Sequence, residues 1–129
     1  MDILAPISVG ELIDKITILR IKRDKIRDAA KQSNIARELK QLMQIRLHPE
    51  LNTARLSALE DQLLQINLRL WQVEDDLRAL DRAGNFGEHF VELARRVYQH
   101  NDARMAVKKE INEVTGSVIV EEKFYSPHG

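Results

Sequence analysis

The sequence contains no cysteine and only five glycines and three prolines among its 129 residues. The absence of cysteine excludes disulfide bonds, thiolate metal sites and a cysteine nucleophile. Glycine and proline are the residues that most often interrupt helices, and two of the prolines, Pro6 and Pro127, lie near the ends of the sequence. Their scarcity therefore predicts long helices.

The sequence also lacks net charge and long apolar runs. Its 20 basic and 20 acidic residues give a formal net charge of zero, whereas proteins that bind polyanions are usually basic. No stretch approaches the roughly 18 apolar residues of a membrane span, and the start, with Asp2, does not resemble a signal peptide. We therefore expect one helical domain over residues 1–129, located in the cytoplasm, without a membrane or nucleic-acid partner.

The first helix is predicted over residues 9–31. Ser8 followed by Glu11 three residues later forms a capping box, which is typical of a helix start. The main apolar stripe of this helix, expected to face the rest of the fold, consists of Leu12, Ile16, Leu19 and Ile26, with Val9 and Ile13 alongside. Ile18 and Ile21 point to the opposite side. Asn34 is expected to cap a second, shorter helix over residues 35–47.

Two later segments repeat apolar residues at alternating intervals of three and four, the spacing of a heptad seam. The first seam is Leu56, Leu59, Leu63, Ile66, Leu70, Val73, Leu77 and Leu80. The second is Phe86, Phe90, Leu93, Val97, His100, Arg104, Val107, Ile111 and Val114. A turn with Gly84 and Gly87 separates them. These patterns predict an all-α fold: a long antiparallel heptad hairpin of residues 52–82 and 87–115, a packed N-terminal helix, a short helix, and extended ends at 3–7 and 117–125.

Two polar residues interrupt the second seam, His100 and Arg104. The simpler interpretation is that they set the register of the hairpin through the pairs His100–Glu74 and Arg104–Asn67. The functional interpretation is an anion pocket for a phosphate or carboxylate, with His100, Arg104 and Lys108 on consecutive turns. Asn101 would then orient the anion, and Glu74 would set the charge of His100.

Other chemical motifs are weak. Acidic pairs such as Glu11 with Asp14 and Glu110 with Glu113 could in principle hold a metal ion, but most such pairs on long helices form ion pairs along the helix. We expect no metal and no cofactor. The sequence has no nucleophile motif and no glycine-rich phosphate loop, so no catalytic residue is assigned. The basic residues between 20 and 27 are interpreted as a solvated helix end rather than a nucleic-acid site.

Excess apolar surface favours self-association. Ile18, Ile21, Tyr98 and Met105 lie outside the main stripes, and large exposed apolar patches are uncommon on monomers. We expect a homodimer or a higher homo-oligomer, with another protein as a possible partner. The predicted function is that of a non-enzymatic helical interaction or scaffold protein. The alternative is a small helical enzyme or binding domain for a phosphorylated or carboxylated metabolite.

Two stretches carry a resemblance to a known family. PISVGELIDKITIL at 6–19 and the segment from LWQVEDD to VEEKFY at 70–125 resemble a small bacterial family, also found in phages, of unknown function. The resemblance implies no established activity; it associates the alternative function with glycan or sugar-nucleotide metabolism. It directs attention to Gly10, Glu11, Asp14, Lys15, Trp71, Glu74, Asp75, Tyr98, Asn101, Asp102, Lys109, Glu110, Asn112, Glu121, Glu122, Lys123 and Tyr125.

Overall fold

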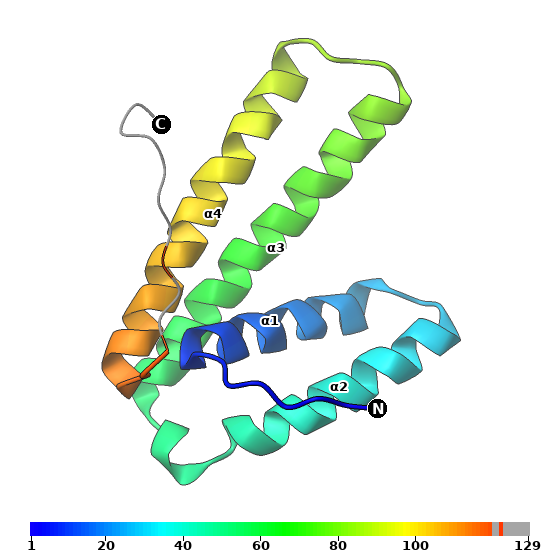
Figure 1. Ribbon diagram of the computed structural model, residues 1–129. Helices are drawn as coiled ribbons and strands as arrows, with labels where there is room; N and C mark the ends of the chain where they lie inside the picture. The colour runs from blue at the N-terminus through cyan, green and yellow to red at the C-terminus, as the bar shows by residue number, and fades with distance from the viewer. Residues whose placement is uncertain (120–121, 123–129) are drawn as a thin grey trace.

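The computed structural model describes residues 1–119 and 122, and these residues form helices and connecting loops without a strand (Figure 1). The elements are α1 (Val9–Lys25), α2 (Ala29–Arg46), the 3-10 turn η1 (Pro49–Leu51), α3 (Ala54–Arg82) and α4 (Glu88–Thr115). The all-α prediction is confirmed. Most of the predicted extended arm at 117–125 lies outside the described residues.

The first helix begins where predicted and ends earlier. Ser8 caps α1, because its Oγ accepts a hydrogen bond from the Glu11 N–H at 3.1 Å. The prediction of one helix over 9–31 is wrong, since the backbone is extended at Ile26 and at Asp28. The Asp28 carboxylate accepts from the Ala30 N–H at 3.3 Å and caps α2. The second helix therefore starts at Ala29, and Asn34 lies inside it rather than at its start.

Two apolar clusters hold the four helices together. One joins Ile13 of α1 to Leu56, Leu59 and Leu63 of α3 and to Val107 and Ile111 of α4. The other joins Leu12, Ile16 and Leu19 of α1 to Ile35 and Leu39 of α2. The main stripe of α1 thus packs on α2 rather than on the α3–α4 pair, because the short connection at residues 26–28 folds α2 back along α1 (Figure 1). Helix α1 is consequently buried on two sides.

The two long helices lie side by side and are joined by the turn at residues 83–87 (Figure 1). Gly84 in this turn has φ 67°, a left-handed conformation that favours glycine. Helix α1 crosses α3 and α4 in the halves of these helices away from the turn, and the turn end projects away from α1 and α2 (Figure 1). In the described part of the chain no helix has the length and hydropathy needed to cross a membrane.

The start of α1 is fixed directly to the end of α4. The Gly10 N–H donates to Asn112 Oδ1 at 2.7 Å, and the Val9 N–H donates to Ser117 Oγ at 3.2 Å. The first N–H groups of a helix have no partner within it, so these side chains complete the capping that Ser8 begins. A Cβ at Gly10 would lie 2.6 Å from the Lys108 carbonyl oxygen. Glycine at this position therefore permits the close approach of the two helices.

Candidate functional site

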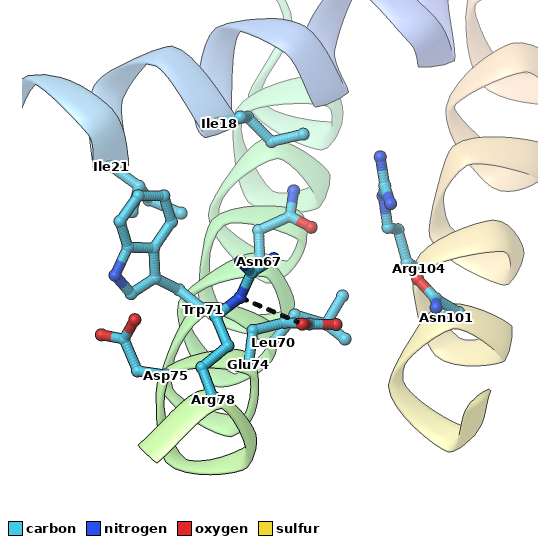
Figure 2. A pocket seen from close by; sticks show the side chains of 10 residues that line it. All are labelled: Ile18, Ile21, Asn67, Leu70, Trp71, Glu74, Asp75, Arg78, Asn101 and Arg104. Carbon is cyan, nitrogen blue, oxygen red and sulfur yellow. Dashed lines mark ion pairs between the residues drawn. The ribbon is translucent and has the colours of Figure 1, made fainter. Parts of the chain in front are cut away.

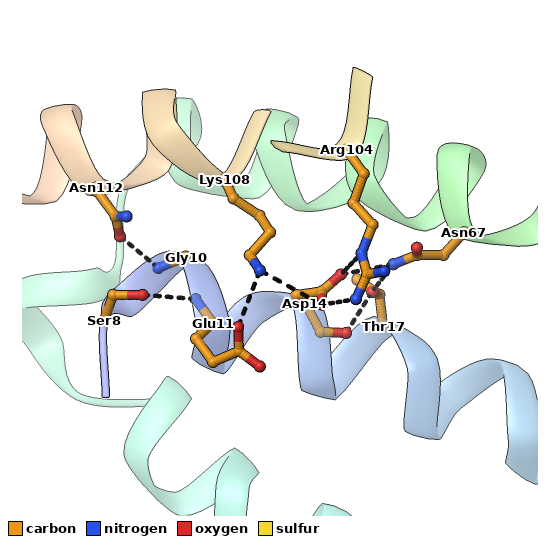
Figure 3. Close-up of polar contacts among 9 residues, drawn as sticks. All are labelled: Ser8, Gly10, Glu11, Asp14, Thr17, Asn67, Arg104, Lys108 and Asn112. Carbon is orange, nitrogen blue, oxygen red and sulfur yellow. Dashed lines mark hydrogen bonds and ion pairs between the residues drawn. The ribbon is translucent and has the colours of Figure 1, made fainter. Parts of the chain in front are cut away.

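A buried polar network connects α1 to α3 and α4 (Figure 3). At its centre is Asp14, whose side chain is 1% exposed. Its carboxylate accepts from Arg104 Nε at 2.9 Å and from Arg104 Nη2, and Asn67 Nδ2 donates to the same carboxylate at 2.9 Å. Asn67 Nδ2 also contacts Thr17 Oγ1 at 2.9 Å. A planar guanidinium bound through two nitrogens fixes the relative position of α1 and α4.

Lys108 extends this network along α4. Its Nζ lies 2.9 Å from Glu11 Oε2 and 4.0 Å from Asp14 Oδ2, and its side chain is 8% exposed. The two carboxylates, Glu11 and Asp14, balance the charges of Arg104 and Lys108. In the described part of the chain no buried side-chain nitrogen or oxygen lacks a hydrogen-bond partner. The network satisfies the condition for burying charges at low cost, namely pairing and hydrogen bonding.

A pocket of about 560 Å³ opens beside this network, between α1, α3 and α4 (Figure 2). Its walls combine apolar, aromatic, acidic, basic and amide side chains. They are Ile18, Ile21, Asn67, Leu70, Trp71, Glu74, Asp75, Arg78, Asn101 and Arg104. Helix α3 contributes most of the wall, with residues 67, 70, 71, 74, 75 and 78 following its helical spacing. Arg104 and Asn67 belong to both the pocket and the network, so the two features are physically joined.

The residues of the predicted anion site are only partly brought together. Arg104, Asn101 and Glu74 line the pocket, whereas Lys108 lies in the buried network and His100 does not line the pocket. Arg104 pairs with Asp14 rather than with Asn67, and Asn67 binds the same carboxylate. Among the described residues no hydrogen bond or ion pair joins His100 to Glu74. Glu74 Oε2 instead lies 3.9 Å from Arg78 Nε.

The four residues of the predicted interface differ in their exposure and do not form one surface. Ile21 is 2% exposed and Ile18 is half-buried, and both line the pocket. Ile21 is therefore covered within the chain and offers almost no surface to a second subunit. Tyr98 is 55% exposed, and Met105 is half-buried.

Many of the polar positions that the resemblance singles out converge on these two features. Gly10, Glu11, Asp14 and Asn112 take part in the contacts between α1 and α4, and Trp71, Glu74, Asp75 and Asn101 line the pocket. Lys15, Asp102 and Lys109 are exposed instead, Glu110 pairs with Arg55, and the tail positions other than Glu122 lie outside the described residues. Within the described residues no three His, Asp or Glu side chains group where they could hold a metal ion.

The pairing of Asp14 with Arg104 is not among the contacts predicted from the sequence. A signal for it exists, because Asp14 lies among Leu12, Ile13 and Ile16 and must be buried with them. A buried acid requires a cation, and Arg104 and Lys108 are the cations whose positions fall on the buried side of the second heptad segment. The contribution of Arg78 to the pocket has no such signal.

The chain belongs to a family of unknown function, DUF6165, which matches residues 3–128. No curated protein and no solved structure matches the chain.

Proposed function

We propose that this member of the family is a non-enzymatic helical interaction protein that self-associates, as a homodimer or a higher homo-oligomer, and acts as a scaffold. One observation carries the proposal. Val91, Tyr98 and Met105 follow one another at seven-residue intervals on α4, and the first two are 47% and 55% exposed. Residues seven apart lie on one side of a helix. They form a row along one side of α4, called here the α4 stripe, that nothing within the described residues covers fully.

The position of the α4 stripe suits contact with a second copy. In the proposal α3 and α4 form an antiparallel, heptad-paired hairpin, and a hairpin of two helices has little means of burying apolar side chains on its outer sides. The stripe begins near the projecting turn, where Phe86 is 57% exposed. Pairing of two α4 stripes around a two-fold axis would remove this surface from water, and closed two-fold dimers are the commonest homo-oligomers.

The mass of the full chain in solution tests the proposal. We expect light scattering after size exclusion, at micromolar concentrations, to give at least twice the mass of one chain, and Val91→Asp to lower it to that of one chain. Burying a carboxylate in the stripe would oppose association. Val114→Asp is a matched control, since Val114 is also 47% exposed on α4 and lies about 140° away around the helix. The proposal is contradicted if the wild-type protein has the mass of one chain, or if Val91→Asp and Val114→Asp lower the mass equally.

A second candidate function is small-molecule binding, and the pocket between α1, α3 and α4 is the observation that favours it. Binding pockets are concave and combine apolar walls with placed polar groups, and this pocket has both. From the sequence we predicted a site for a phosphorylated or carboxylated metabolite linked to glycan or sugar-nucleotide metabolism. Two of its predicted residues, Arg104 and Asn101, line the pocket and support this ligand class. The other two predicted cations, Lys108 and His100, do not line the pocket and give this ligand class no support.

A further inference from the structure

The pocket is more acidic than its wall residues suggest. The wall carries two carboxylates, Glu74 and Asp75, and two guanidinium groups, Arg78 and Arg104. The charge of Arg104 is already balanced from the protein interior, because Asp14 binds its Nε and Nη2. The ion pair of Arg78 with Glu74 is loose, at 3.9 Å, with side chains 73% and 47% exposed. Because the acids and bases of the buried network balance each other, the remaining wall charges, Glu74, Asp75 and Arg78, leave one negative charge in excess.

An aromatic ring lies next to this negative charge. Trp71 and Asp75 are four residues apart on α3, so their side chains lie on the same side of the helix. Both line the pocket with Ile18, Ile21 and Leu70, which supply apolar walls (Figure 2). The indole ring is the side chain that attracts organic cations most strongly, through the negative face of its π system.

We infer that the pocket binds an organic cation: a small ligand with a primary or quaternary ammonium group and an apolar body. The ammonium lies against the Trp71 ring and is balanced by Asp75 and Glu74. The apolar body contacts Ile18, Ile21 and Leu70, and the Asn101 amide provides a hydrogen-bonding group on the opposite wall. A phosphate or carboxylate would instead meet Glu74 and Asp75, and the positive charge of Arg104 is already shared with Asp14. The inference deepens the second candidate function and does not depend on self-association.

The single tryptophan of the chain makes the pocket directly observable. We expect tetramethylammonium chloride and butylammonium chloride to change the Trp71 fluorescence of the full chain saturably in the millimolar range. Sodium chloride at equal ionic strength should not. A saturable response to sodium phosphate or to glucose, without one to the two ammonium salts, would overturn the inference in favour of an anion or a neutral sugar. The absence of any saturable response would also overturn it.

Substitutions at the wall separate the contributions of charge and ring. Asp75→Asn should weaken butylammonium binding about threefold to tenfold, whereas Asp61→Asn, the same change at an exposed position of α3 outside the pocket, should leave it unchanged. Trp71→Leu, followed by calorimetry because it removes the fluorophore, should weaken binding by a similar factor, and Trp71→Phe by less. Circular dichroism confirms that each variant is folded. Equal weakening of butylammonium binding by Asp61→Asn and Asp75→Asn would overturn the inference. The mass of the protein in solution tests self-association separately.

Discussion

Replacing Gly10 by alanine is the most direct test of how closely α1 approaches α4. The added Cβ would lie 2.6 Å from the Lys108 carbonyl oxygen and 3.0 Å from Asn112 Oδ1. The Asn112 side chain can move away, but the Lys108 oxygen belongs to the backbone of α4. Contacts of a Cβ under 3.0 Å essentially never occur, so the two helices must separate by at least a few tenths of an ångström.

The expected loss of stability follows from three effects. Overpacking at a close contact costs about 1 to 3 kcal/mol. Separation of the helices also lengthens the hydrogen bond from the Gly10 N–H to Asn112, which contributes about 0.5 to 1.5 kcal/mol. Alanine recovers at most about 1 kcal/mol through its higher helix propensity. We expect Gly10→Ala to lower the free energy of unfolding by about 2 kcal/mol.

Urea unfolding followed by circular dichroism, at one fixed protein concentration, measures this change. Gly87→Ala is the control, because the nearest atom to a Cβ there is 3.5 Å away and the residue has φ −74°. It should cost under about 1 kcal/mol as a less favourable helix cap. Adding Asn112→Ala to Gly10→Ala should not restore stability, since the backbone contact remains. A Gly10→Ala variant as stable as the wild type would refute the close approach.

Two further predictions concern charges and helix boundaries. Asp14→Asn should lower the free energy of unfolding by about 3 kcal/mol in urea, because Arg104 loses its buried carboxylate; a loss no larger than that of the exposed Asp61→Asn would contradict the network. Asp28→Ala should cost about 1 kcal/mol by removing the cap of α2. Asn34→Ala, inside α2, should change stability little, and a larger loss at Asn34 than at Asp28 would show that α2 begins later.

The long helices could be predicted from the sequence because their signals are local. Regular apolar spacing and the glycine turn place α3 and α4 within two residues of the predicted ranges 52–82 and 87–115. The N-cap of α1 was found in the same way, from Ser8 and Glu11. The boundary between α1 and α2 could not be predicted in this way, since Asp28 and Asn34 are both good capping residues and the sequence does not rank them. The earlier start is favoured by Gln32 in the first turns of α2, whose Nε2 donates to the carbonyl oxygens of Arg23 and Ile26 near the end of α1.

The candidate site could be predicted only in part because it depends on how α1 crosses the other helices. His100 and Arg104 occupy similar seam positions, yet Arg104 lies where α1 crosses α4 and His100 lies beyond it. The heptad pattern indicates which side chains face α3, but it contains no information on the crossing angle of a third helix. Asp14, the partner of Arg104, is 90 residues away in the sequence, and the pocket walls come from three helices. Neither feature can be read from the spacing within one helix.

The contacts that complete the first turn of α1 also bear on the order of folding. Gly10 and Asn112 are 102 residues apart in the sequence, and Val9 and Ser117 are 108 apart. Closing loops of this length costs chain entropy, and contacts distant in sequence slow folding. During synthesis from the N-terminus, α1 emerges long before α4 exists, with α2 as its first partner. We therefore expect α1 and α2 to pair early and to complete their docking on α3 and α4 only after α4 has been made.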